Sequence, residues 1–446
     1  MFGFIKRIFG GGAAVQNNHD PFSRDMPAAS SVAPVPPPPV RAAPAIVMQR
    51  DEIIDAKTRI AGYRFSARRP DSALQADAAS TLEILSANNV AAFAERRIAL
   101  IPLSSADWVS LNYRPLIGTH TVFLLSLPER DEEAKTWSEV AAMIREAGGK
   151  IALAAGAMLS HRELVLGDAD FLLLDFPSYS LANLEKMIKG LRVAKPGLQL
   201  IADNVGRWPE QRYCIAHGIS HCIGSFTTQP DEEQPSGEIG QSRLVLIEMI
   251  NHLRKEADLA DIAEIAKRDP GVVVKVIAMA NSPMLGLSQS VTSVDQAIMV
   301  LGREQLYRWL SIGLFRAGST SPRDEVLLEM ALGRGRFLEV LGQDKHSKLE
   351  RDELFLLGLL SLLDCLLGIP MSAVVERVHL SPALKEVLLN NSGPLGRYLL
   401  LAIAVEKGSV QNTSRLAEQL GYSLEAVETA SLEAIGWAEE ATRLSA

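Results

Sequence analysis

The 446-residue sequence predicts an α/β (β/α) barrel followed by an all-α helical domain. From residue 46 to residue 230, short apolar runs alternate with segments of helical period, which is typical of parallel strands joined by helices. The number of runs is enough for the sheet to close into a barrel. From residue 242 to residue 446, by contrast, nearly every segment has helical period.

The apolar runs define the expected strands of the barrel in order. They are IVMQRDEII, IAGYRFSA, RIALIPLS, TVFLLSL, KIALAAG, DFLLLDF, LQLIAD and HCIGSF. They are unbroken because strands of a parallel sheet are buried on both faces. Between two of them, residues 131–149 carry Ala141, Ile144 and Arg145 at helical spacing and end in a glycine pair, so we expect a helix with its C-cap there.

The expected helices of the second half also follow one another closely. They are LVLIEMINHLRK, DLADIAEIAKRD, GVVVKVIAMAN, SVDQAIMVLG, REQLYRWLSIGLF, EVLLEMALGRGRFLEVLG, DELFLLGLLSLLDCLLG, MSAVVERV, SPALKEVLL and LGRYLLLAIAVEKG, with a final pair in 412–446. A polar stretch with Pro and Gly, residues 231–241, reads as the linker between the two halves.

The first 45 residues differ from the rest of the chain. Residues 1–45 are rich in Pro and Ala and cannot supply a hydrophobic core, so we expect a disordered tail. Within it, residues 2–9 (FGFIKRIF) form a small cationic amphipathic patch. This patch either makes weak contact with a membrane surface or a partner, or is a frayed terminus.

Composition narrows the class of function. The formal net charge of −8 argues against nucleic-acid binding through a large basic surface. Three cysteines at irregular spacing, without a secretory signal, favour a reducing cytoplasm over a disulfide framework. No apolar run of about 18 residues is free of charges, so we expect no membrane-spanning helix.

The helical half carries a set of short signatures in a fixed order. Asp269-Pro270 opens one segment, Asn281-Ser282 closes it, and SVDQAIMVLG follows and ends at Gly302. Each signature alone is ordinary helix punctuation. In this order and spacing they resemble the HDOD domain, a bacterial all-helical relative of the HD and HD-GYP phosphohydrolases. Residues 242–446 are therefore expected to be an HDOD domain.

The first half resembles a second family. HDOD domains commonly follow a barrel related to the EAL-type cyclic di-GMP phosphodiesterases, and five segments here are similar to that barrel. They are DEIIDAKTRIAGYRFSARR as the opening hairpin, KIALAAG as the strand of the paired aspartates, FLLLDF, LIADNVGR and HCIGSFTTQP. The chain thus resembles an EAL-HDOD two-domain bacterial signalling protein, with residues 46–230 as its barrel.

The resemblance also implies that the barrel is degenerate. An active EAL enzyme holds divalent metals with carboxylate and amide oxygens. The family's ligand and motif positions are here occupied by Arg64, Ser66, Pro102, Ala154, Ala155, Leu173, Gly206 and Ile223. Arg68 and Asp175 match the family, and Asp203 stands where a glutamate is usual. We expect Asp175 and Asp203 to pair with an arginine, Arg64 or Arg68, rather than to bind a metal.

The HD-type metal site is also altered in the helical half. The His-Asp pair of the HD-GYP pattern falls at Ser361 and Leu362, and His346 and His379 are isolated. We therefore expect no enzyme and no cofactor. The expected function is a catalytically inactive signal-transduction regulator or scaffold that binds proteins through the HDOD domain. The alternative is a non-hydrolysing sensor that binds a cyclic di-GMP-like nucleotide at the barrel mouth.

One loop is a candidate contact for a protein partner. The apolar segment after Asn281 contains Leu285 and Leu287, which either present a surface to the partner or fold inward.

Three other signals have ordinary explanations. CIAHGISHC (214–222) combines cysteines and histidines, but a helix end and a strand would make these side chains diverge, so zinc is not expected. LGRGRF (332–337) lacks the strand and third glycine of a phosphate loop, so its arginines are expected on a solvated helix face. REQLYRWL (303–310) places aromatics beside arginines, but helical spacing favours core and groove positions over nucleic-acid stacking.

Overall fold

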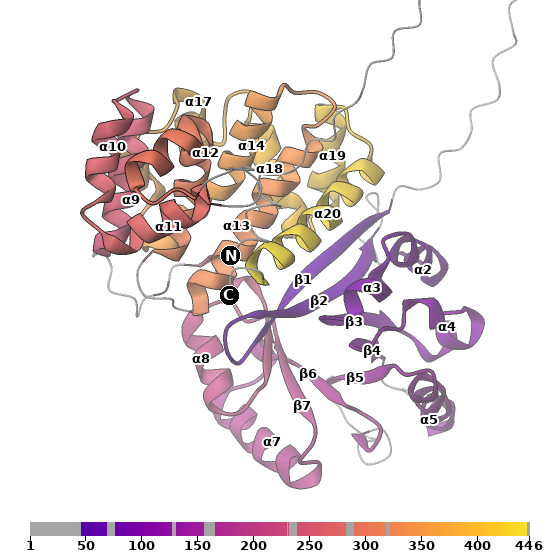
Figure 1. Ribbon diagram of the computed structural model, residues 1–446. Helices are drawn as coiled ribbons and strands as arrows, with labels where there is room; N and C mark the ends of the chain where they lie inside the picture. Colours follow the sequence, from indigo (N-terminus) through magenta and orange to yellow (C-terminus); the bar gives the residue numbers. More distant parts are fainter. Residues whose placement is uncertain are drawn as a thin grey trace, which may run out of the picture.

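The structure is a computed structural model with a barrel and a helical half (Figure 1). It describes residues 46–68, 76–126, 131–155, 166–229, 231, 239–281, 290–317 and 322–443. The predicted fold class is confirmed, because a closed eight-stranded barrel precedes a helical region. The N-terminal tail, with the patch at residues 2–9, lies outside the described residues.

The eight strands follow one another in chain order around the barrel. They are β1 (Val47–Asp55), β2 (Ile60–Arg68), β3 (Ile98–Leu103), β4 (Thr121–Leu125), β5 (Lys150–Ala155), β6 (Phe171–Asp175), β7 (Gln199–Asp203) and β8 (His221–Ile223). Strand β1 is antiparallel to both of its neighbours, β2 and β8, whereas all other pairs are parallel. A tight turn at Asp55 joins β1 to β2, since the Asp55 side chain accepts hydrogen bonds from the backbone of Lys57 and Arg59.

Helices connect the parallel strands and cover the outside of the barrel (Figure 1). They are α2 (Ala78–Ala87), α3 (Val90–Ala94), α4 (Ser105–Ser110), α5 (Asp131–Glu146), α7 (Leu181–Ala194) and α8 (Trp208–Ala216), with short 3-10 turns η1 (Arg114–Leu116), η2 (Phe176–Ser178) and η3 (Ser225–Thr228). The predicted helix in 131–149 is therefore present.

The interior of the barrel is a packed apolar core. Eight buried side chains from seven of the strands build it, two of them from β6: Ile53, Leu100, Val122, Ala152, Phe171, Leu173, Ile201 and Ile223. Inward side chains of this kind normally fill a small barrel. Leu173 and Ile223, which the sequence analysis assigned to polar positions of the EAL pattern, belong to this core.

The helical half packs around one large hydrophobic cluster. Its helices are α9 (Gln241–Arg254), α10 (Leu259–Ala266), α11 (Pro270–Ala280), α12 (Val294–Arg316), α13 (Pro322–Leu341), α14 (Lys348–Leu360), α15 (Leu363–Leu367), α16 (Met371–Arg377), α17 (Pro382–Asn390), α18 (Gly396–Glu406), α19 (Val410–Leu420) and α20 (Leu424–Arg443). No single helix in the described part of the chain is long and apolar enough to span a membrane, although the bent pair Lys348–Leu367 and Met371–Arg377 passes the same test of length and composition together.

The helical half lies directly against the first strand of the barrel (Figure 1). The backbone amide of Met48 on β1 donates a buried hydrogen bond of 3.0 Å to Glu428 on α20. Arg50 on the same strand bonds the hydroxyl of Ser431 at 2.6 Å. The barrel's hydrophobic cluster also includes Val326 of α13. The two halves thus share buried polar and apolar contacts.

Candidate functional site at the barrel mouth

The carboxyl ends of β6 and β7 bring two acidic residues together. Asp175 and Asp203 are the last residues of these strands and pair directly across the sheet. Parallel strands end at the same edge, which is where open and closed α/β sheets place their ligands. A binding site is therefore expected at the mouth of the barrel.

An arginine from the opening hairpin occupies this mouth. Arg64 on β2 bonds Asp203 at 2.5 Å through Nη1 and Asp51 of β1 at 2.9 Å through Nε. Burial of Arg64 opposes its charged form, but the carboxylates of Asp51 and Asp203 outweigh burial and raise the pKa of Arg64. Asp51 lies opposite Arg64 in the hairpin register, and the sequence analysis did not single it out.

Asp175 has different partners from Asp203. The hydroxyl of Ser178 and the side-chain amide of Asn204 both donate to it, the latter at 2.8 Å. These hydrogen bonds hold the pKa of Asp175 below its usual value. Asn204 adopts a left-handed conformation, with φ of 60°, directly after β7. The loop after β7 therefore orients one carboxylate of the mouth.

The remaining predicted mouth residues contribute no charge to this cluster. Ala154, near the end of β5, is partly buried, and its neighbour Ala155 ends the strand. Arg68 is the last residue of β2, lies across the hairpin from Val47, and takes no part in the bonds around Arg64. Of the two arginines proposed as partners, Arg64 is the one that pairs with Asp203.

The described residues do not fit a divalent metal at this mouth. Asp51 and Asp203 both bind the Arg64 guanidinium, and Asp175 is bound by Ser178 and Asn204. Within the described ranges, no group of three or more His, Cys, Asp or Glu residues is arranged to hold an ion. We therefore derive no reaction step through a metal.

The helical half places its signature residues at helix ends. The carboxylate of Asp269 caps α11 by accepting from the amides of Gly271 and Val272, at 2.7 and 3.2 Å, and Pro270 is the first residue of that helix. Asn281 follows the helix and bonds both the amide and the carbonyl of Val291 at 2.7 Å. Ser282, Leu285 and Leu287 lie outside the described residues, so the proposed partner contact stays a prediction.

Gly302 has a conformational role that its signature did not reveal. Its φ of 68° and ψ of 173° break α12 in the middle, so a new helix begins at Arg303. A residue with a side chain rarely adopts a positive φ, which explains why the position holds glycine.

The prediction that Arg334 lies on a solvated helix face is wrong. Arg334 is buried, bonds both carboxylate oxygens of Glu406 at 2.8 and 2.6 Å, and donates to Ser361 at 2.6 Å. Ser361, at the altered His-Asp position, thus accepts from an arginine. The helical spacing of LGRGRF could have indicated this difference, because residues two positions apart lie on different faces of a helix.

The cysteines and histidines of CIAHGISHC do not converge as a group of four. Cys214 on α8 and Cys222 on β8 interact with each other in the buried cluster between the sheet and its outer helices. His217 instead stacks on the ring of Tyr213, with 4.1 Å between ring centroids, and His221 bonds the hydroxyl of Ser220 at 2.9 Å.

Comparisons with known proteins identify the helical half. Residues 243–370 match the HDOD domain model. The chain is 24% identical over 272 residues to "Cyclic di-GMP phosphodiesterase CdgJ" of Vibrio cholerae, covering 61% of this chain and 62% of that protein. It is 28% identical over 247 residues to "Uncharacterized protein YuxH" of Bacillus subtilis, covering 54% and 59%. The chain therefore matches about six-tenths of the length of these two relatives.

Solved EAL structures resemble the chain over a shorter part. A standalone EAL protein from Vibrio cholerae O395, solved with cyclic di-GMP bound, aligns with 40% of this chain and 89% of its own length, at 14% identity and a TM-score of 0.32.

The relationship to CdgJ corrects the functional prediction. The prediction that the protein is a catalytically inactive regulator and not an enzyme is wrong, because a homologue is named a cyclic di-GMP phosphodiesterase. Substituted motif positions in one sequence do not establish inactivity at this divergence. In addition, the segments after β4 and β5 contain Glu129, His161 and Glu163, which lie outside the described residues.

The recognition made from the signatures is confirmed at the level of domains. The chain contains an HDOD domain at residues 243–370, and this domain follows a closed eight-stranded barrel.

Proposed function

We propose that the protein binds cyclic di-GMP at the mouth of its barrel and takes part in the turnover of this nucleotide. Homology to CdgJ supports the ligand. The observation that carries the proposal is the Arg64 cluster, which holds a guanidinium at the carboxyl end of the sheet between Asp51 and Asp203.

The geometry of Arg64 suits a phosphodiester ligand. A guanidinium has five N–H donors, and the two ion pairs engage Nε and Nη1. Donors therefore remain for the oxygens of a phosphodiester, which arginine binds well. Asp203 and Asp51 hold the side chain in place, so that little rotamer entropy would be lost on binding.

The carboxylates supply the second kind of contact. A guanine base presents N–H donors on its Watson–Crick edge, and a carboxylate is the natural acceptor for them. Asp175, with its lowered pKa, stays ionised and lies beside Asp203. We assign phosphate recognition to Arg64 and base recognition to Asp175 on this chemistry.

The test combines binding with product formation. Full-length protein is titrated with cyclic di-GMP by calorimetry, and linear dinucleotide is followed in the presence of Mg²⁺ or Mn²⁺. We expect saturable binding in the wild type and at least about tenfold weaker binding for Arg64→Gln. The matched control is Asp168→Asn, at a partly exposed residue that precedes β6 at the amino end of the sheet and pairs with Arg145.

Two results would overturn the proposal. One is no binding of cyclic di-GMP to the wild type. The other is binding that Arg64→Gln and Asp175→Asn leave unchanged while both variants keep the wild-type melting temperature.

We further propose that the protein works in a reducing compartment such as the cytoplasm. Cys214, Cys222 and Cys365 are all free and buried, and the first two lie close enough to interact. Neighbouring thiols that stay unpaired are typical of proteins from reducing compartments.

A further inference from the structure

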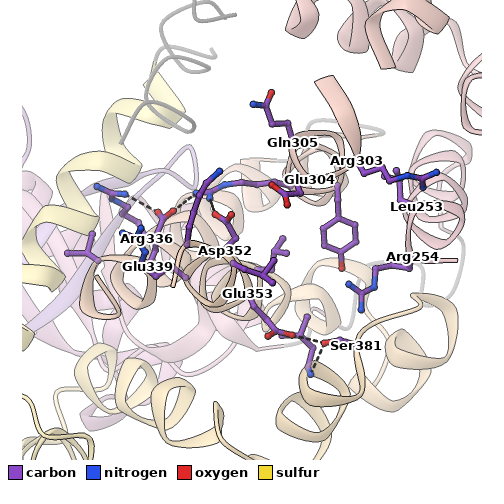
Figure 2. Close-up of a pocket in the computed structure, with 18 of the residues that line it drawn as sticks. Leu253, Arg254, Arg303, Glu304, Gln305, Arg336, Glu339, Asp352, Glu353 and Ser381 are labelled. Atoms are coloured by element: carbon purple, nitrogen blue, oxygen red, sulfur yellow. Dashed lines mark hydrogen bonds and ion pairs between the residues drawn. The ribbon is translucent and has the colours of Figure 1, made fainter. Parts of the chain in front are cut away.

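The helical half contains a large cavity away from the barrel mouth (Figure 2). Its volume is about 770 Å³, within the range of small-molecule sites. The walls come from the end of α9, the second part of α12, the later turns of α13, the first turns of α14 and the start of α17. The proposed function does not use this cavity.

The charge of the cavity is predominantly positive. Six basic residues line it, against four acidic ones. Two of the basic residues, Arg308 and Arg336, are neutralised by Glu339 and Asp352 in a chain of ion pairs of 2.8–3.0 Å. Figure 2 shows the Arg336–Glu339 part of this chain on one side of the cavity, with Arg254 on the other. An excess of cations therefore remains in a protein whose net charge is −8.

A buried hydroxyl in the wall lacks a partner. Tyr307 is 8% exposed, and its hydroxyl makes no hydrogen bond to a described residue. Arg254 lies over its ring, 5.7 Å from the centroid. The Nε of Arg351, which also lines the cavity, is buried without a partner as well. Buried polar atoms normally have partners, so these two atoms indicate that something outside the described chain completes the site.

The break in α12 adds a further anion-binding element. Because the backbone is not helical at Gly302, the helix restarts at Arg303, and its first three residues, 303–305, all line the cavity. The first turn of a helix carries the positive end of the helix dipole and amides without intrahelical acceptors. Phosphate groups bind such ends readily.

The rest of the lining suits an organic ligand better than a bare anion. Leu349, Leu356 and Leu384 provide apolar walls. Glu304 and Glu353 provide carboxylate acceptors, and Glu353 already accepts from Ser381 at 2.8 Å. A ligand that complements this wall has an anionic group, a flat apolar body and N–H donors, and a nucleotide has all three.

We propose that this cavity is a nucleotide-binding site, with the phosphate near Arg254 and Arg351 and the base between the leucines and the carboxylates. The helical half then has a ligand of its own, separate from the nucleotide at the barrel mouth.

Calorimetry of the full-length protein with GMP, AMP, guanosine and inorganic phosphate tests this proposal. We expect GMP or AMP to bind, and guanosine and phosphate to bind at least about tenfold more weakly, because each lacks one half of the contacts. Arg254→Gln should weaken nucleotide binding about tenfold or more. Arg397→Gln, an exposed arginine of α18, is the matched control and should leave binding unchanged.

Tyr307→Phe provides a second variant that keeps the fold. Removing a hydroxyl without a partner breaks no described contact, so the melting temperature should stay the same or rise, while nucleotide binding weakens several-fold. In a protein that carries both Arg64→Gln and Asp175→Asn, which remove the contacts proposed for the barrel mouth, GMP binding should persist, and this separates the two sites.

Any of three results would overturn the proposal. These are no binding of GMP or AMP by the wild type, equally tight binding of inorganic phosphate, or unchanged binding in both Arg254→Gln and Tyr307→Phe.

Discussion

Arg97, in the segment before β3, donates to both carboxylate oxygens of Glu329 on α13, at 2.5 and 3.1 Å. The two side chains are only 15% and 10% exposed, so the pair lies inside the contact between the two halves. Glu439 of α20 adds a second carboxylate 3.6 Å from Arg97. A buried arginine therefore joins the barrel to two helices of the other half.

Removing one member of this pair should destabilise the whole protein. Glu329→Ala leaves a buried guanidinium without its main partner, and we expect a loss of about 3 kcal/mol in the free energy of unfolding. Urea titration with a fluorescence readout measures the change. The comparison is Glu185→Ala, which breaks the exposed pair with Lys189 on α7 and should lower the free energy of unfolding much less. Equal effects of the two substitutions would show that the interdomain pair is not buried in solution.

Glu52 should make stability depend on pH. Burial between the halves raises the pKa of this carboxyl to about 7. Its contribution to stability is therefore complete below the ordinary pKa of a glutamate and is lost as the pH rises through 7. Glu52→Gln cannot ionise, so the variant should match the wild type near pH 5 and exceed it at pH 8, by at most about 3 kcal/mol.

Melting temperatures of both proteins between pH 5 and pH 9 test this expectation. Glu83→Gln, at an exposed position of α2, is the control. A Glu52→Gln variant that is less stable than the wild type at pH 8 would contradict the proposed cause.

Replacing Gly302 should distort the cavity of the helical half. Gly302→Ala forces a side chain into a backbone with φ of 68°, which should cost about 1–3 kcal/mol. Gly190→Ala should instead stabilise the protein. Gly190 lies inside α7 with open space around it, and alanine is favoured over glycine within a helix by roughly 0.5–1 kcal/mol. Thermal melts should therefore move in opposite directions, and a shift of the same sign would disprove the kink.

Asn281 should stabilise the fold through its hydrogen bonds to the backbone of Val291. Its amide bonds both backbone groups of Val291, which is 8% exposed. Asn281→Ala leaves this buried N–H and C=O without partners, and we expect a loss of about 2 kcal/mol by urea titration. Asn183→Ala, on the exposed side of α7, should change stability by less than about 0.5 kcal/mol. A neutral Asn281→Ala would mean that water replaces the amide.

Sequence patterns predicted the barrel well because buried strands and amphipathic helices leave a regular period of apolar residues, which can be read from a short stretch of sequence. Asp175 and Asp203 could be assigned to neighbouring strand ends for the same reason, and they are direct partners. Asp51 was missed because its role comes from the antiparallel register of the hairpin, which places it opposite Arg64. The burial of Arg334 was missed because its partner, Glu406, lies 72 residues away.

The cavity of the helical half could not be predicted from the sequence. Its cations come from separate helices, and no spacing relates Arg254 to Arg351. Gly302 was recognised only as a signature, because a single glycine in a helical pattern does not disclose a positive φ.

The docking of β1 against α20 has a consequence for the order of folding. Strand β1 closes the barrel through β8, and its Met48 amide binds Glu428, which lies 380 residues further along the chain. During synthesis β1 leaves the ribosome long before α20 does. The seam of the barrel thus gains its contacts with α20 only after the 380 residues that separate Met48 from Glu428 have been made, and contacts of such long sequence separation form slowly. Until α20 has been made, β1 exposes the surface that this helix will cover, and transiently exposed surface of this kind promotes aggregation.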